Sequence, residues 1–217
     1  ELRMLQETGE ADAVRYINTV NNAARNQLLA FNLAHYYFVQ NNYAKTVEYY
    51  DLAGYDNLSN EQIADAKFEK AYAYFNLKQF DLAKPLFNEI HQLPKHKYYI
   101  PANYYYGFIA YKEKQYDEAM KAFKLVETQP EYKGVVPYYI AEIYYFQGKK
   151  DEALNYGQSI IKQGTSIYYD KQLKLLTGQL YFEKQQFAKA LPLLEDYVNN
   201  NEKVSKEVLY ELSYCYY

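Results

Sequence analysis

Apolar and small residues repeat along the whole chain with a nearly constant spacing. In each repeat a small residue is followed, twelve positions later, by a second small residue. The pairs are Ala34 with Thr46, Ala71 with Ala83, Gly107 with Ala119, Ala141 with Ala153, and Gly178 with Ala190, and Ser213 begins a sixth pair. The first members of successive pairs are 37, 36, 34, 37 and 35 residues apart. Such a period is typical of chains built from stacked structural repeats.

Each repeat predicts two helices. Bulky apolar residues follow the second small residue at offsets of four and seven, which share one helical face. In the third repeat we expect a first helix over residues 101–113 and a second over residues 117–129; these are the A and B helices of a repeat. The small residues should mark the point where the two helices cross closely. Asp81, Asp117 and Asp151 stand where B helices should begin, and we expect them to be N-caps.

Four stretches of the chain resemble the tetratricopeptide repeat: "EKAYAYFNLKQFDLAKPLF", "YYGFIAYKEKQYDEAMKAF", "YIAEIYYFQGKKDEALNY" and "LTGQLYFEKQQFAKALPLL". The resemblance covers essentially the whole chain. It implies an all-α fold, namely a right-handed α-solenoid of antiparallel helix pairs coiled into a superhelix. We expect one solenoid domain over residues 1–217, with units at 1–26 (partial), 27–63, 64–99, 100–133, 134–170, 171–205 and 206–217 (partial). The partial units at both ends indicate a fragment of a longer array, because solenoids need capping units.

Three residues depart from the repeat pattern. Thr46 replaces the second small Ala, and Lys150 replaces the aromatic residue that opens the other B helices. Gly157 stands where the other units have a bulky core residue. Because a glycine within a helix costs about 1 kcal/mol relative to alanine, we expect the unit at 134–170 to be locally the least stable.

Composition narrows the possible functions. The 217 residues include 30 Tyr, 11 Phe and no Trp, and the net charge is −3, which argues against a nucleic-acid binder. Cys215 is the single cysteine, so no internal disulfide framework exists. No stretch of the sequence is long and apolar enough to span a membrane. The abundance of Tyr, Asn, Lys and Gln favours a bacterial source. The sequence does not fix the compartment; the bacterial cell envelope or periplasm is favoured over the cytoplasm.

One face of the A helices is expected to be rich in aromatic residues. In proteins of the family that the chain resembles, the A helices line a concave groove in which partners bind. Carrying that register along the chain gives the candidate partner-binding residues, with Leu175, Gln179 and Tyr217 on the same face. The candidates are Phe31, His35, Phe38, Phe68, Tyr72, Phe75, Tyr104, Phe108, Tyr111, Tyr138, Glu142, Tyr145, Phe182, Tyr210 and Tyr214.

Two interpretations of this aromatic stripe stay open. The rings can pack between neighbouring A helices and complete the core, or part of the stripe can be a binding surface, for which tyrosine offers a large area and a polar tip. The family's clamp for acidic chaperone tails uses Lys, Arg and Asn at these positions, so the aromatic residues argue against that activity.

The sequence predicts a non-enzymatic scaffold that binds a protein or peptide segment in an aromatic-lined groove. The glycines form no phosphate-binding loop, and His35, His91 and His96 have no metal-ligand spacing, so we expect no catalytic residue, metal or cofactor. We expect His91 and His96 to be solvated. Three alternatives are a glycan-binding module of the cell envelope, a helical-repeat RNA reader, which would need a basic groove, and an accessory segment of a larger enzyme.

Overall fold

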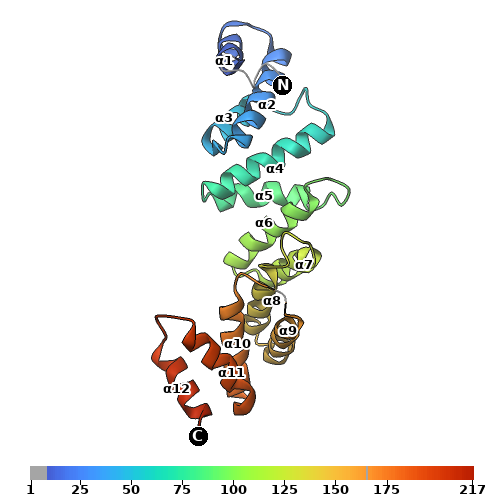
Figure 1. Ribbon diagram of the computed structural model, residues 1–217. Helices are drawn as coiled ribbons and strands as arrows, with labels where there is room; N and C mark the ends of the chain where they lie inside the picture. The colour runs from blue at the N-terminus through green and yellow to red at the C-terminus, as the bar shows by residue number, and fades with distance from the viewer. Residues whose placement is uncertain (1–8, 165) are drawn as a thin grey trace. The chain divides into compact units, whose positions relative to one another are not determined.

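The computed structural model describes residues 9–164 and 166–217, which form twelve α-helices and no strand (Figure 1). Residues 1–8 of the expected partial unit at 1–26 lie outside the described residues. The helices are α1 (Gly9–Thr19), α2 (Ala23–Val39), α3 (Tyr43–Ala53), α4 (Asn60–Asn76), α5 (Phe80–Ile90), α6 (Tyr99–Lys112), α7 (Tyr116–Val126), α8 (Val136–Phe146), α9 (Lys150–Gln163), α10 (Asp170–Glu183), α11 (Phe187–Asn199) and α12 (Lys206–Cys215). The chain divides into two compact units, and the division falls between Ile109 and Ala110, within α6.

The helices alternate between A and B types in the expected register. In the first unit α2 packs on α3 and α4 packs on α5, and in the second unit α8 packs on α9 and α10 packs on α11. The A helices α2 and α4 also contact each other, as do α8 with α10 and α10 with α12. The expectation of an all-α repeat solenoid is therefore confirmed. The unit borders expected before residues 27 and 64 fall four residues inside α2 and α4, which begin at Ala23 and Asn60.

The small residues lie where the helices cross. All five A–B pairs are buried, and Ala71, Ala83, Ala141 and Ala190 are among those with at most 1% of their surface exposed. At Gly178 an added Cβ would lie 3.0 Å from Leu194 Cδ2, on the partner B helix α11. A larger side chain at this position would therefore push α10 away from α11.

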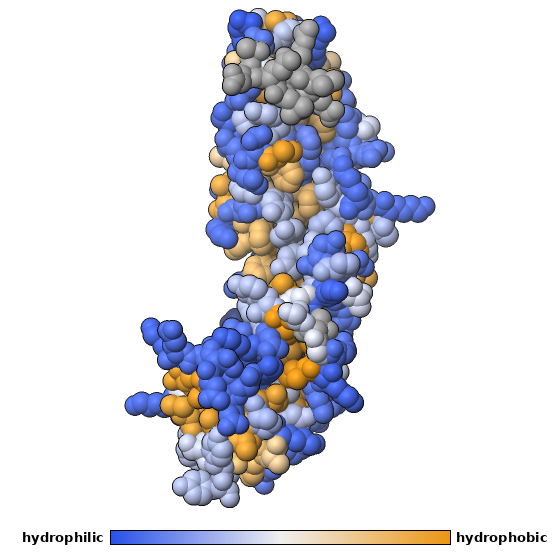
Figure 2. Space-filling view, viewed as in Figure 1, coloured by the Kyte–Doolittle hydropathy of each residue, from blue (hydrophilic) through white to orange (hydrophobic). Residues whose placement is uncertain are grey.

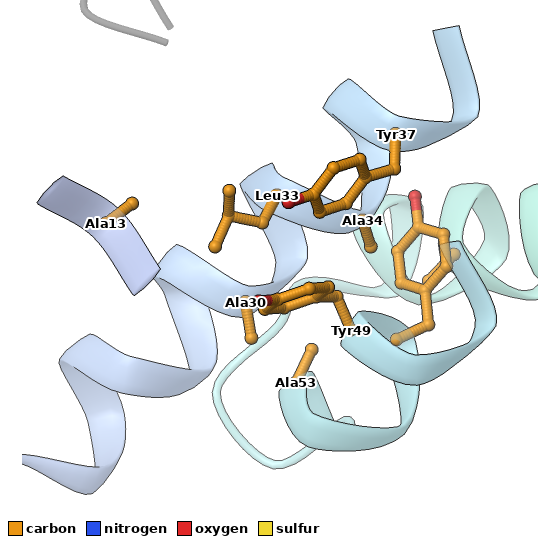
Figure 3. Packing of buried hydrophobic residues seen from close by; sticks show 9 residues of the cluster. Ala13, Ala30, Leu33, Ala34, Tyr37, Tyr49 and Ala53 are labelled. Carbon is orange, nitrogen blue, oxygen red and sulfur yellow. The ribbon is translucent and has the colours of Figure 1, made fainter. Parts of the chain in front are cut away.

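The core of the first unit contains tyrosine rings as well as aliphatic groups. Leu33 and Tyr37 of α2 face Tyr49 and Ala53 of α3, and Ala13 of α1 lies beside Leu33 (Figure 3). The Tyr37 hydroxyl donates a 2.5 Å hydrogen bond to Glu10 Oε1, so a tyrosine reaches across the core and ties α1 to α2. Part of the high tyrosine content is thus structural.

Every complete A–B turn is closed by the same backbone hydrogen bonds. In the first turn, Asn41 N–H donates to Phe38 O at 2.9 Å and Asn42 N–H donates to Tyr37 O at 2.8 Å, which is the Schellman pattern. The same pair of bonds closes the other four turns. The pattern requires one residue with positive φ, and the five residues in this place are Asn41, Lys78, Lys114, Gly148 and Gln185, with φ between 57° and 74°. Only one of the five is glycine.

The expected N-caps are wrong. The B helices α5, α7 and α9 begin at Phe80, Tyr116 and Lys150, so Asp81, Asp117 and Asp151 are the second residues of their helices. The capping positions hold Gln79, Gln115 and Lys149, none of which makes a side-chain cap hydrogen bond. The three aspartates still favour these helices, because a negative charge in the first turn interacts well with the helix dipole.

Gly157 lies at a close contact between α9 and α10. It is buried, and an added Cβ would lie 2.5 Å from Thr177 Oγ1. Thr177 is itself 1% exposed and donates a 2.7 Å hydrogen bond to Leu173 O. The absence of a side chain at Gly157 therefore leaves no gap, because α9 and α10 approach each other closely at this point.

Candidate functional site

The structure places the fifteen candidate residues at three levels of burial. Phe68 is buried, and His35, Tyr210 and Tyr214 are exposed. The remaining candidates are half-buried: Phe31, Phe38, Tyr72, Phe75, Tyr104, Phe108, Tyr111, Tyr138, Glu142, Tyr145 and Phe182. Most of these rings contact a neighbour and also keep some surface in solvent, so their burial is compatible with both interpretations of the stripe.

In the first unit the rings of successive A helices pack edge to face. Phe38 of α2 meets Tyr72 of α4 with ring centroids 5.6 Å apart and planes at 79°. Tyr72 meets Tyr105 of α6 at 5.2 Å and 88°, and Phe75 meets Phe108 at 5.6 Å and 66°. This geometry is the one that aromatic quadrupoles favour, so the exposed ring edges are held in fixed positions.

A buried carboxylate lies behind this row of rings. Glu69 of α4 is 1% exposed and accepts hydrogen bonds from three side chains. Tyr50 Oη donates at 2.5 Å, Tyr98 Oη donates at 3.3 Å, and His35 Nδ1 lies 2.9 Å from Oε1. Burial, together with the charge of Glu69, raises the pKa of Tyr50 and of Tyr98. The carboxylate therefore has three partners within the first unit, one of which can carry a positive charge.

In the second unit Glu142 of α8 joins two of the candidate tyrosines. Tyr111 Oη donates to Glu142 Oε2 at 2.6 Å, and Tyr138 Oη donates to Oε1 at 2.7 Å. Burial and these hydrogen bonds raise the pKa of both tyrosines. The two rings are therefore fixed at their polar tips, and their hydroxyl protons are already donated to Glu142.

The far end of the second unit has another buried carboxylate. Glu211 of α12 is 9% exposed, and Gln179 of α10 donates to it at 3.0 Å from Nε2 to Oε2. Burial raises the pKa of Glu211, and the nearby charges of Glu207 and Glu183 add to that effect, while the bond from Gln179 opposes it. Exposed rings lie on the same helix, with the centroids of Tyr210 and Tyr214 6.2 Å apart.

One register rule places both buried carboxylates. Each A helix has one small residue at the crossing point. The residue that follows it in one A helix contacts a residue of the next A helix, namely the one two positions before that helix's own small residue. His35 meets Glu69 in this way, Tyr72 meets Tyr105, and Gln179 meets Glu211. The sequence reasoning named the first member of each pair and missed Glu69 and Glu211. The signal was available, because Glu69 and Glu211 both stand two positions before a small residue.

The histidines near the α5–α6 loop are not solvated as expected. The His91 ring stacks on Tyr106 with centroids 4.6 Å apart, and the His96 side chain is only 11% exposed beside Asp65. Lys97 forms a 2.7 Å ion pair with the same aspartate, so the loop is held against α4. Among residues 9–164 and 166–217, no group of three or more His, Cys, Asp and Glu side chains is arranged to hold a metal ion. No helix in this described part is long and apolar enough to cross a membrane.

Alkaline pH is expected to unfold the chain cooperatively. Burial, followed by the hydrogen bond to Glu10, raises the pKa of Tyr37 to about 12, and five other tyrosines have raised pKa values for similar reasons: Tyr50, Tyr98, Tyr111, Tyr138 and Tyr156. The folded state favours the neutral phenols, so their contribution to stability is complete below the ordinary tyrosine pKa of about 10 and is lost as pH rises through the folded values.

Phenolate absorbance and helical circular dichroism, measured together during a base titration, test this expectation. Phenolate should form in two stages, with the second stage coinciding with the loss of helix. The same titration in denaturant supplies the control, since all tyrosines should then ionise near pH 10. Complete ionisation of the folded protein near pH 10 with the helical signal intact would contradict it.

Comparison with known proteins supports the fold. No protein-family model and no curated protein matches the chain. MamA from AMB-1 aligns with a TM-score of 0.66 and 14% identity over 85% of this chain and 96% of that chain. YrrB, described as a TPR protein with an unusual peptide-binding site, aligns with a TM-score of 0.65 and 17% identity over 86% and 91%. MamA from MSR-1 gives 0.61 and 14% over 80% and 95%. At these identities the likeness is one of fold, and the chain has the tetratricopeptide-repeat fold that its sequence resembles.

Proposed function

We propose that this chain is a non-enzymatic scaffold that binds a peptide or protein segment on the aromatic face of its A helices. The observation that carries the proposal is the row of half-exposed rings held in place by edge-to-face contacts, such as Phe38 on Tyr72. Rings that are already fixed lose little conformational entropy on binding, so their buried area contributes more fully to affinity. The peptide-binding site named for YrrB, which has the same fold, is consistent with this function.

The exposed rings at the end of the second unit offer the sharpest test. Tyr210 is 63% exposed and Tyr214 is 49% exposed, so changing both to serine should remove binding area, at the cost of the ring contacts that Tyr214 makes with Phe182 and Phe187. Tyr168, which lies in the α9–α10 loop and is 81% exposed, provides the matched control Tyr168→Ser. The change in side chain is the same, but the position lies outside the A helices.

The measurement is a pull-down from the source lysate with partners identified by mass spectrometry, alongside thermal melts by circular dichroism. The wild type and Tyr168→Ser should retain the same partners, and Tyr210→Ser/Tyr214→Ser should lose them while remaining folded at the temperature of the binding assay. Retention of every partner by the double variant would exclude this part of the face as a binding surface. Binding of the wild type to polysaccharide or peptidoglycan, with no protein partner, would favour the glycan-binding alternative.

A further inference from the structure

Glu211 lacks the histidine partner that its counterpart in the first unit has. Glu69 and Glu211 occupy the same register position, two residues before the small residue of their A helices. Glu69 faces His35 and two tyrosine hydroxyls. Glu211 faces Gln179, whose amide is neutral. Within the described part of the chain, no Lys, Arg or His forms an ion pair or hydrogen bond with Glu211.

A buried charge without a counter-charge is unusual in a folded protein. Buried carboxylates are normally paired, because desolvation disfavours the charged form. The acidic neighbours of Glu211 do not relieve this cost. Glu207 lies one turn earlier on α12, and Glu183 lies at the end of α10, where Lys150 already forms a 2.6 Å ion pair with it. Neither neighbour therefore supplies a counter-charge for Glu211.

The surface beside Glu211 is suited to a cation. Tyr210 precedes Glu211 on α12 and Tyr214 follows it by three residues, and both of these rings are exposed, with centroids 6.2 Å apart. Aromatic faces attract guanidinium and ammonium groups, and a carboxylate next to them strengthens that attraction. The lower part of Figure 2, which holds α10, α11 and α12, shows hydrophobic side chains among hydrophilic ones on the face in view. Phe182 of α10 packs on Tyr214 with centroids 5.6 Å apart, which adds apolar contact area.

We propose that the partner of this scaffold is a basic segment, whose arginine or lysine side chain lies over Tyr210 and Tyr214 and supplies the counter-charge for Glu211. This inference rests on the proposed function and adds the chemistry of its ligand. An arginine suits the site best, because its planar group can stack on a tyrosine ring and pair with a carboxylate together. Beside its basic residue, the segment would place an apolar side chain against Phe182 and a polar side chain against Gln179.

Glu211→Gln tests the inference with minimal change in shape. The new amide oxygen can still accept the hydrogen bond from Gln179, so the fold is preserved. Burial raises the pKa of Glu211, so the folded state favours the protonated carboxyl group. The stability that this group contributes is complete below the ordinary glutamate pKa of about 4.3 and is lost as the pH rises, so the ionised carboxylate opposes folding at neutral pH. The variant should therefore melt at a higher temperature than the wild type at neutral pH, with the difference vanishing in acid. At the same time it should bind basic segments about tenfold or more weakly.

The probe is a displayed library of short random peptides selected on the immobilised protein. Peptides selected by the wild type should be enriched in arginine and lysine, and their affinity should fall in Glu211→Gln. Gln179→Lys should weaken binding as well, because it supplies the missing charge from within the chain. Glu152→Gln, the same change at an exposed position on the B helix α9, should select the same peptides as the wild type.

The outcomes separate the two proposals. Selected peptides without basic residues, or basic peptides that bind Glu211→Gln and wild type equally well, would refute the basic ligand while leaving the scaffold function standing. A library from which the wild type selects nothing would contradict both proposals.

Discussion

Glycine in place of Lys78, Lys114 and Gln185 is expected to stabilise the protein, by about 0.5–1 kcal/mol at each site. These residues close the A–B turns with φ of 63°, 62° and 57°, a region in which a Cβ is strained. All three are exposed, so the loss of the side chain should cost little. Glycine removes the strain but gives the unfolded chain more freedom, and the first effect is the larger.

The turn of the fourth repeat supplies the reverse experiment. Gly148 has φ of 74°, and nothing lies within 4 Å of an added Cβ. Gly148→Ala should therefore destabilise the chain through backbone strain alone, by about 1 kcal/mol. Asn41 is left out of the set, because asparagine tolerates this conformation and its side chain accepts a 2.9 Å hydrogen bond from Tyr43.

Thermal and urea melts of the triple glycine variant measure the effect. The matched control changes the same three residues to alanine, which removes the same side chains without relieving the strain. The glycine variant should melt above the wild type, and the alanine variant should not. If the alanine variant is as stable as the glycine variant, side-chain loss and not backbone strain accounts for the change.

The helix pairs could be read from the sequence because their cause is local and repeated. A close crossing tolerates only small side chains, so positions such as Ala71 and Ala83 recur at a fixed offset and mark both helices. The starts of the B helices α5, α7 and α9 were displaced by one or two residues because the closed A–B turn, not a side-chain cap, precedes them. Gln79, at the capping position before α5, makes no side-chain cap bond, and its N–H donates to Tyr74 O in that turn.

The candidate site was predictable in register but not in exposure. The spacing placed Phe38, Tyr72 and Phe75 on one face, yet how deeply each ring is buried depends on the neighbouring A helices. The spacing placed Glu69 two positions before a small residue but could not reveal its hydrogen-bond partners, because Tyr50 lies on α3 and Tyr98 lies in the α5–α6 loop. Contacts between residues far apart in sequence therefore account for most of what was missed, including the burial of His96.

Gly157→Ala is expected to destabilise the second unit by about 1–3 kcal/mol, although alanine is the better helix former. The view of Gly157 as a weak point in the core predicts the opposite, a gain of about 1 kcal/mol from helix propensity. The contact between the new Cβ and Thr177 decides between these two expectations. The new Cβ would lie 2.5 Å from Thr177 Oγ1, and the side chain of a buried threonine on a helix has few other rotamers.

A double-mutant cycle isolates this contact. Thr177→Ala alone should cost stability, because it removes buried atoms and the hydrogen bond to Leu173 O. In that background Gly157→Ala should cost much less or become stabilising, since the new methyl group enters the space that Thr177 has left. Thr177→Val removes the same hydrogen bond but retains the bulk, so it should give no rescue. Equal effects of Gly157→Ala in all three backgrounds, measured by urea melts, would show that the close approach of α9 to α10 does not require the glycine.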